Sequence, residues 1–146
     1  MLVTAGASGI GLSIAASFAM AGAKVCVCDN DAAAVAELED ERADLQACVA
    51  DVSQPGQVED LFNEIKSRFG GLDILVNNAG IGGPVGRLEK VLESEWVKTI
   101  EVNLLGAYYC CRHAIPLLDM AAGGSIVNLS SSAGLYGPPN RTPYVS

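Results

Sequence analysis

The sequence lacks any apolar run of the length that crosses a membrane. Half of its 146 residues are hydrophobic, but apolar stretches such as 1–5, 24–28 and 72–76 are short. A transmembrane helix needs roughly 20 such residues in a row. No basic segment followed by an apolar leader opens the sequence, and we expect no secretory signal. We therefore expect a cytoplasmic protein with no membrane partner.

Positive charge is also scarce. Nine lysine and arginine residues stand against seventeen aspartate and glutamate residues, which gives a formal net charge of −8 at pH 7. Proteins that bind the phosphate backbone of nucleic acid, or an anionic membrane, need clusters of basic side chains. The sequence has no such cluster, and we expect no nucleic-acid partner.

Aromatic residues and metal-binding motifs are few as well. Aromatics make up 5% of the chain, which disfavours the bulky core of an all-β sandwich. The five cysteines lie within apolar runs without the spacing of a metal site, and we interpret them as small buried hydrophobic residues. They are Cys26, Cys28, Cys48, Cys110 and Cys111. His113 belongs to no constellation of ligands or bases, which predicts a surface or interface histidine and no metal.

What the sequence does contain is an alternation of strand-like and helix-like segments. Strands are predicted at 2–4, 24–29, 45–51, 72–78 and 124–130. Helical patterns separate them, which is the order of βαβ units and of a parallel sheet. The strand runs are nearly continuous in apolar residues, as expected where helices cover both faces. We predict an α/β fold, a Rossmann-like doubly wound parallel sheet in three αβα layers, with residues 1–146 forming a single domain.

Two of the helical patterns carry apolar residues at intervals of three or four, which should face the sheet. The positions are Ile10, Ile14 and Phe18 in the first pattern and Val58, Leu61, Phe62, Ile65 and Phe69 in the second. Ser53 is placed to cap the second helix, and Pro55 falls near its first turn. The glycine- and proline-rich segments 81–86 and 136–143 follow strands, where loops of an open α/β sheet form ligand sites.

The segment TAGASGIG at 4–11 follows the first predicted strand and opens a helix. Glycines there let the backbone approach a pyrophosphate and let the helix pack on the strand, while the first helical amides face the anion. A simple turn is the alternative, but the context favours a dinucleotide-binding domain. The predicted cofactor-binding residues of this segment are Gly6, Ser8, Gly9, Ile10 and Gly11.

The second predicted strand ends in Asp29, about 20 residues beyond the glycine loop. A carboxylate at this place accepts hydrogen bonds from the adenosine ribose and repels a 2′-phosphate. Neither Ser8 nor Asn30 is a cation that could meet that phosphate. The sequence therefore predicts NAD in preference to NADP. The alternative is that Asp29 only caps the helix expected from about Ala32.

Four separated motifs resemble the short-chain dehydrogenase/reductase family. They are TAGASGIG at 4–11, NNAG at 77–80, Asn103 in EVNLLGAYY, and Ser131 with Tyr144 thirteen positions later. The resemblance implies an oxidoreductase that transfers hydride between NAD(H) and a small alcohol or ketone. A hydroxyl that polarises a carbonyl and a phenol that supplies its proton suit that reaction. The spacing to Tyr144 and the offset of Gly134 favour Ser131 over Ser130 and Ser132.

The resemblance also implies a role for each matching residue. Asp51 and Val52 would flank the adenine; Asn78, Ala79 and Gly80 would border the cofactor groove; Asn103 would hold a proton-relay water; and Ser131 and Tyr144 would act on the substrate, with Tyr144 also at the cofactor. Plainer alternatives exist: Asp51 could cap the turn near Gln54, the NNAG asparagines could tie strands together, and Asn103 could kink a long helix.

The sequence departs from the family pattern at two places. Ala5 stands where the leading glycine of the loop is usual, although Gly6 follows at once. The lysine of the family's YxxxK motif would fall two residues beyond Ser146. We therefore expect a domain that is incomplete on its C-terminal side. An NAD-binding fragment without turnover is the alternative to an active enzyme, whereas GASGIG and NNAG disfavour a sugar-nucleotide epimerase.

The family resemblance further implies a dimer or tetramer. Such an assembly would be built partly on one long helix with apolar residues on both sides. These residues are Trp96, Ile100, Leu104, Tyr108 and Ile115.

Overall fold

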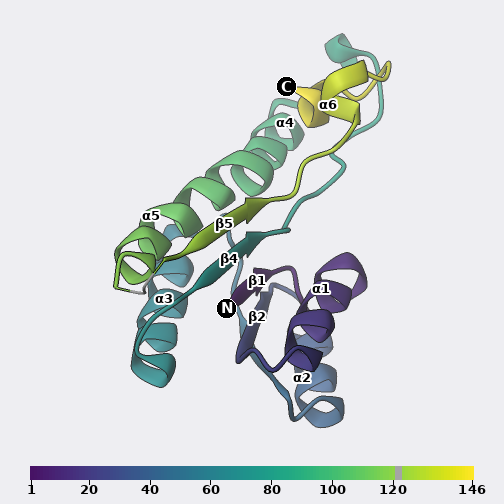
Figure 1. Cartoon of the computed structure of the whole chain (residues 1–146). Helices are drawn as coiled ribbons and strands as arrows, with labels where there is room; N and C mark the ends of the chain where they lie inside the picture. The colour runs from purple at the N-terminus through teal and green to yellow at the C-terminus, as the bar shows by residue number, and fades with distance from the viewer. Residues whose placement is uncertain (121–122) are drawn as a thin grey trace.

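A five-stranded parallel sheet forms the centre of the computed structural model, which describes residues 1–120 and 123–146 (Figure 1). The strands are β1 (Leu2–Thr4), β2 (Val25–Asp29), β3 (Leu45–Val49), β4 (Ile74–Asn77) and β5 (Ser125–Asn128). They lie in the order β3-β2-β1-β4-β5, so the chain crosses from one half of the sheet to the other between β3 and β4. This is the doubly wound arrangement, with a switch point between β1 and β4. The predicted α/β class and all five predicted strands are confirmed.

Helices cover both faces of the sheet (Figure 1). They are α1 (Gly9–Met20), α2 (Ala32–Glu41), α3 (Pro55–Phe69), η1 (Leu88–Lys90), α4 (Glu93–Ile100), the π-helical turn η2 (Glu101–Leu105), α5 (Gly106–Leu118), α6 (Ala133–Tyr136) and α7 (Thr142–Val145). Helices α1 and α2 lie on one face, and α3 and α5 lie on the other. The short helix α7 packs against α4 at the carboxyl edge of the sheet.

Two hydrophobic clusters fill the space between the sheet and its helices. On β2, Cys26 and Cys28 join the cluster under α3 and α5, whereas Val25 and Val27 join the cluster under α1 and α2. Successive side chains of a strand point to opposite faces, so a strand buried on both sides needs apolar residues at every position. This explains the unbroken run VCVC.

Helix α1 packs on the sheet through small residues rather than through the predicted apolar face. Gly11 and Ala15 are its buried positions, and Ile14 and Phe18 are only half-buried. Ile10 is 68% exposed. The expectation for Ile10 is therefore wrong, because α1 approaches the sheet too closely for large side chains along the line of contact.

Helix α3 follows its predicted pattern more closely. Its buried side chains are Val58, Leu61, Phe62 and Ile65, and Phe69 packs at the margin. Pro55 is its first residue, as predicted. Ser53 does not cap it: Gln54 is the N-cap residue, and the Ser53 hydroxyl instead donates to Asp51 Oδ1 at 2.8 Å.

The strand β5 departs from the expectation of helices on both faces. Val127 is 49% exposed, although Ile126 packs into the cluster under α5. Among the described residues, the main sheet contacts of α1 and α2 are with β1, β2 and β3, away from Val127. Strand β3 is the opposite edge and, in the described part of the chain, pairs with β2 alone.

The cysteines and the histidine lie mainly in the cluster under α3 and α5. Cys26, Cys28 and Cys110 are buried, as predicted, while Cys48 and Cys111 are half-buried. Burial raises the pKa of the Cys110 thiol to about 12. The His113 ring stacks on Phe62, with ring centroids 5.9 Å apart. Within the described residues, no three metal-binding side chains gather into a cluster, and no helix has the length and apolar character to cross a membrane.

The turn from β1 into the glycine loop contains an alanine in the left-handed region. Ala5 has a φ of 49°, which favours glycine. We expect Ala5→Gly to raise the free energy of unfolding by about 1 kcal/mol, because the Cβ atom disfavours this conformation. Urea denaturation measures the change.

The control for Ala5→Gly is Ala21→Gly, at the end of α1, where φ is −80°. An ordinary φ gives glycine no advantage, so this variant should show no gain in stability. Equal stabilisation by both substitutions would contradict the assignment of strain to Ala5.

Candidate active site

The glycine loop lies tightly against the ends of β2 and β4. A Cβ atom on Gly6 would stand 2.6 Å from Val27 Cβ, on β2. A Cβ atom on Gly11 would stand 2.1 Å from the Ala5 carbonyl oxygen and 2.6 Å from Asn78 Nδ2. Neither position accepts a side chain without backbone movement. The close approach seen here is between elements of the protein itself, and it fixes the course of the loop into α1.

The amino end of α1 is open to an external acceptor. Ser8 is the N-cap residue, but its side chain makes no capping hydrogen bond. Gly9 has a φ of 53°, and the space next to its Cα is empty to 4 Å. In contrast, Asp31 caps α2 by accepting hydrogen bonds from Ala33 N and Ala34 N at 3.0 and 3.1 Å. The uncapped amides of α1 fit a phosphate group, which a helix amino terminus attracts.

The residues of the NNAG motif hold neighbouring strands together. The backbone amides of Asn78 and Ala79 donate to the buried Thr4 Oγ1 at 3.0 and 2.9 Å. Asn78 Nδ2 donates to the carbonyl oxygens of Thr4 and Ala5 at 2.9 and 3.0 Å. Asn78 therefore does tie neighbouring strands together, as the plainer alternative for the NNAG asparagines expected. The same contacts place the backbone of 78–80 beside the glycine loop.

Asn77 ties the other pair of strands. Its Nδ2 donates to Asn128 Oδ1 at 2.8 Å, which links the ends of β4 and β5. The side chain is 6% exposed, and Nδ2 also lies 3.3 Å from Cys111 Sγ. Both asparagines thus act at the carboxyl edge, one on each side of β4.

A cavity of about 170 Å³ opens where β2 and β3 end. Its lining residues are Ala5, Asp29, Asn30, Ala50, Asp51, Val52, Ala79, Gly80, Ile81, Lys98 and Val102. Asp29 Oδ2 accepts from Ala7 N, and Asp29 Oδ1 accepts from Asp31 N, each at 3.2 Å. The capping alternative for Asp29 is wrong, because Asp31 caps α2. Asp29 is half-buried and faces this cavity beside the glycine loop.

Asp51 and Val52 share that cavity but also have structural contacts. Asp51 Oδ1 accepts from the Ser53 amide and hydroxyl at 2.9 and 2.8 Å, and the Asp51 carbonyl accepts from Gln54 N at 3.0 Å. Asp51 therefore does organise the turn into α3. Val52 is buried against Gly106, whose Cβ would stand 2.7 Å from Val52 Cγ2.

Lys98 is a lining residue that the sequence did not bring to notice. It comes from α4, far along the chain from Asp29, yet it lines the same cavity as Asp29 and Asp51. Ser8 and Asn30, the positions where the sequence places a possible cation, lie far from Lys98 along the chain. No local pattern connects α4 with these segments.

A larger cavity of about 400 Å³ lies beside the first and contains the predicted catalytic residues. Its lining includes Ile10, Asn78, Ala79, Gly80, Ile81, Gly82, Asn103, Leu104, Ser130, Ser131, Gly134, Pro143 and Tyr144. The two cavities share Ala79, Gly80 and Ile81. Ser130 and Ser131 both line it, whereas Ser132 is the N-cap residue of α6. Ser131 Oγ accepts from Ala133 N at 3.1 Å, which orients the hydroxyl group.

Asn103 fixes the loop that follows β4. It lies in η2, between α4 and α5, and its Oδ1 accepts from Ile81 N at 2.8 Å. Its Nδ2 donates to the Ile81 carbonyl oxygen at 2.9 Å. The plainer alternative was that Asn103 kinks a long helix. The helix is indeed interrupted here, by a π-helical turn, which is a feature frequent at functional sites. The side chain is nevertheless engaged with backbone rather than free.

The two glycine- and proline-rich loops lie side by side, as expected from their positions after strands. One guanidinium NH of Arg141 donates to the Gly82 carbonyl oxygen at 3.3 Å, and Gly86 N donates to the Asn140 carbonyl oxygen at 2.9 Å. These contacts hold the segment that carries Tyr144 over the larger cavity. Arg141 was not singled out in the sequence, because its partner is distant in the chain.

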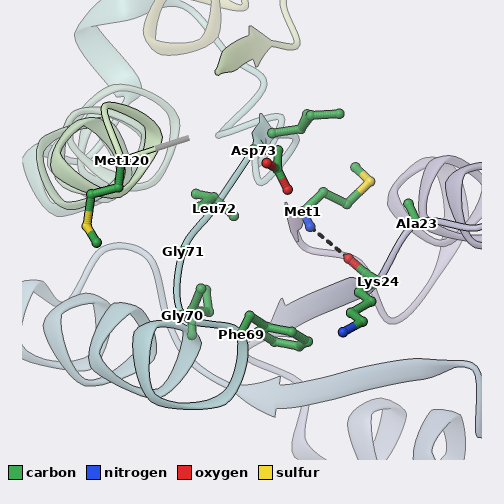
Figure 2. Close-up of a pocket in the computed structure, with 11 residues that line it drawn as sticks. Met1, Ala23, Lys24, Phe69, Gly70, Gly71, Leu72, Asp73 and Met120 are labelled. Carbon is green, nitrogen blue, oxygen red and sulfur yellow. Dashed lines mark hydrogen bonds between the residues drawn. The ribbon is translucent and has the colours of Figure 1, made fainter. Parts of the chain in front are cut away.

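A third cavity, of about 420 Å³, lies at the opposite end of the sheet (Figure 2). Met1, Lys24, Phe69, Asp73 and Met120 are among its lining residues, and the Met1 amino group donates to the Lys24 carbonyl oxygen at 2.7 Å. Burial lowers the pKa of that amino group, and the charge of Asp73 opposes the shift. None of the predicted site residues lines this cavity.

Comparison with known proteins agrees with these motifs. The chain is 39% identical, over 150 aligned positions, to a 3beta-hydroxysteroid dehydrogenase of Mediterraneibacter gnavus, covering 100% of this chain and 54% of the relative. It is 38% identical to an L-fucose dehydrogenase of Rattus norvegicus, covering 100% of this chain and 54% of the relative. A 3-oxoacyl-(acyl-carrier-protein) reductase of Staphylococcus aureus is 37% identical, with 99% of this chain and 61% of the relative covered.

The chain thus spans a little over half the length of these relatives. A family model described as short chain dehydrogenase matches residues 1–146. With its doubly wound sheet, its glycine loop and its serine and tyrosine in one cavity, the chain belongs to the short-chain dehydrogenase family.

Proposed function

We propose that this chain carries the cofactor site and the reacting side chains of an NAD-dependent dehydrogenase or reductase. The observation that carries the proposal is the larger cavity, where Ser131 and Tyr144 meet the backbone of 78–80. That backbone also lines the cavity of Asp29 and Asp51. One extended ligand can therefore reach from the carboxylates to the tyrosine.

The residues present fit a nicotinamide dinucleotide. The open amino end of α1 would hold the pyrophosphate. Asp29 would accept hydrogen bonds from the adenosine ribose, with Asp51 and Val52 beside the adenine. Asn78, Ala79 and Gly80 would border the middle of the cofactor, and Ile10 and Tyr144 would border its nicotinamide end. When bound, the cofactor supplies or accepts the hydride.

Two hydroxyl groups of the chain act on the substrate in this proposal. Ser131 Oγ donates a hydrogen bond to the substrate oxygen and so polarises a carbonyl group. The Tyr144 hydroxyl gives a proton to that oxygen during reduction and takes it during oxidation. Asn103 would hold a water near Tyr144, from the backbone position that its bonds to Ile81 fix.

The substrate class is a small-molecule alcohol or ketone. The names of the three relatives specify a hydroxysteroid, the sugar L-fucose and a 3-oxoacyl group on an acyl-carrier protein as their substrates, and these differ widely in size. What they have in common is an alcohol or carbonyl carbon. We extend only this shared chemistry to the present chain.

Assembly and location are further parts of the proposal. Exposed apolar side chains follow α4, η2 and α5: Val97, Leu104, Tyr108 and Ile115. They support a homo-oligomer, a dimer or tetramer, with this long helix at the interface. Trp96 and Ile100 are half-buried and contribute less. A cytoplasmic location stays a prediction.

Cofactor preference can be tested at the end of β2. Asp29→Ala together with Asn30→Arg should shift preference from NAD(H) toward NADP(H), because a repelling carboxylate is replaced by a cation near the 2′-phosphate. Calorimetric titration with each cofactor measures the two affinities. Lys98→Ala is the matched control, because it removes a cation that lines the same cavity. It should lower the affinity for NADP(H) below that of the unchanged chain. Tighter binding of NADP(H) than of NAD(H) by the unchanged chain would refute the NAD assignment.

The role of Tyr144 is tested by Tyr144→Phe, assayed by NAD reduction with a panel of secondary alcohols. We expect a loss of turnover of at least about 100-fold, because the substitution removes the proton that Tyr144 transfers. NAD affinity should change little, because the ring of the side chain is retained. Tyr136→Phe is the matched control, because Tyr136 is 83% exposed and outside the cavity.

The outcomes separate two functions. Full activity of Tyr144→Phe would sink the proton-transfer role. NAD binding by the unchanged chain without turnover on any alcohol would favour the alternative, an NAD-binding unit that does not catalyse. Absence of NAD binding would overturn both.

A further inference from the structure

Two thiols lie side by side at the edge of the sheet, away from the proposed active site. Cys26 on β2 and Cys48 on β3 share a hydrogen bond, with their sulfur atoms 3.9 Å apart. Cys26 is 2% exposed, whereas Cys48 is half-buried. Both side chains face α3, from which Glu64 and Arg68 approach Cys48. Neither residue has a part in cofactor or substrate binding as described above.

The two thiols differ in acidity. The hydrogen bond from Cys26 lowers the pKa of Cys48, with a smaller contribution from the Arg68 charge, against burial and Glu64. The same hydrogen bond, together with burial, raises the pKa of Cys26. A thiolate is the nucleophilic form of cysteine. Cys48 is also the more exposed of the two thiols, and we therefore assign it as the one that an oxidant reaches first.

We propose that Cys26 and Cys48 form a reversible intramolecular disulfide when the protein meets hydrogen peroxide. In the first step the Cys48 sulfur attacks one peroxide oxygen; an S–O bond forms, the O–O bond breaks, and the departing oxygen leaves as water with the proton that Cys48 gives up. Cys48 is then a sulfenic acid. In the second step the Cys26 sulfur attacks the Cys48 sulfur, the S–O bond breaks, and a second water leaves with the Cys26 proton. Two thiols are oxidised by two electrons, and one hydrogen peroxide is reduced to two waters.

The strand register makes this disulfide a labile one. Cys26 lies opposite Gln46 and Cys48 lies opposite Cys28, so the reacting pair is diagonal across the two strands. The sulfur atoms must move from 3.9 Å to about 2.05 Å apart. Strand β3 is an edge strand, so a local movement along its direction that brings Cys48 toward Cys26 disturbs the pairing with β2 and with no other described strand. Strained disulfides of this kind are more readily reduced.

Cys28 is the competing partner for Cys48, but its environment disfavours it. It is fully buried, and burial raises its pKa well above the usual value, assisted by the nearby Cys110. Cys28 lies directly opposite Cys48, yet Cys26 is the thiol that makes the hydrogen bond. We therefore expect the bond to Cys26 and not to Cys28.

The test is a peptide map of the full chain after treatment with hydrogen peroxide and blocking of remaining thiols with iodoacetamide. Trypsin cleaves after Lys24, Arg42 and Lys66, which places Cys26 and Cys28 in 25–42 and Cys48 in 43–66. We expect these two peptides to be linked, with fragment ions placing the link at Cys26. The thiol count should fall by two from five and return with dithiothreitol.

Variants supply the controls. Cys26→Ser and Cys48→Ser should each abolish the linked peptide, and Cys111→Ser should leave its yield unchanged, because Cys111 is half-buried on α5 without a part in the pair. The unchanged chain decides the matter even if a variant folds poorly. A link at Cys28, or oxidation of Cys48 to a sulfinic acid without any linked peptide, would overturn the proposal. This result does not depend on whether the chain binds NAD.

Discussion

The site depends on one buried hydroxyl group. Thr4 Oγ1 accepts hydrogen bonds from two successive amides that directly follow β4, Asn78 N and Ala79 N, and Asn78 Nδ2 donates to the carbonyl oxygens of Thr4 and Ala5. Because β1 and β4 meet at the switch point of the sheet, this set of bonds fixes the glycine loop against the 78–80 segment. A buried polar group that lost its partners would cost about 1–3 kcal/mol.

Two of the cavities along the carboxyl edge of the sheet adjoin at the segment that this junction holds. The one over β2 and β3 holds carboxylates, and the one over β4 and β5 holds a serine and a tyrosine. Ala79 and Gly80 belong to both, so the segment held by Thr4 forms the wall between them. Asn103, through Ile81, extends the same wall into the loop beyond β4. The proposed dinucleotide site thus rests on backbone that the side chains of Thr4, Asn78 and Asn103 hold in place.

Strands and motifs could be predicted from the sequence because their signals are local. The run VCVC predicted a strand buried on both faces, and Ser131 and Tyr144 lie in one cavity as their spacing suggested. What the sequence could not provide were pairings between distant residues. Asp31 rather than Asp29 caps α2, and Arg141 donates a hydrogen bond to Gly82. Lys98 lines the same cavity as Asp29, and Cys26 contacts Cys48. The prediction that Ile10 faces the sheet was wrong, because helical spacing does not reveal how closely α1 approaches the sheet.

Binding of a dinucleotide along the carboxyl edge of this sheet is tested residue by residue by titrating the ¹⁵N-labelled chain with NAD and recording two-dimensional NMR spectra. We expect the largest shifts at the amides of Gly9, Ile10, Asn78 and Gly80, with Lys24 and Asp73 in the cavity at the opposite end unaffected. Shifts confined to Lys24 and Asp73, or none at the glycine loop at saturating NAD, would contradict it.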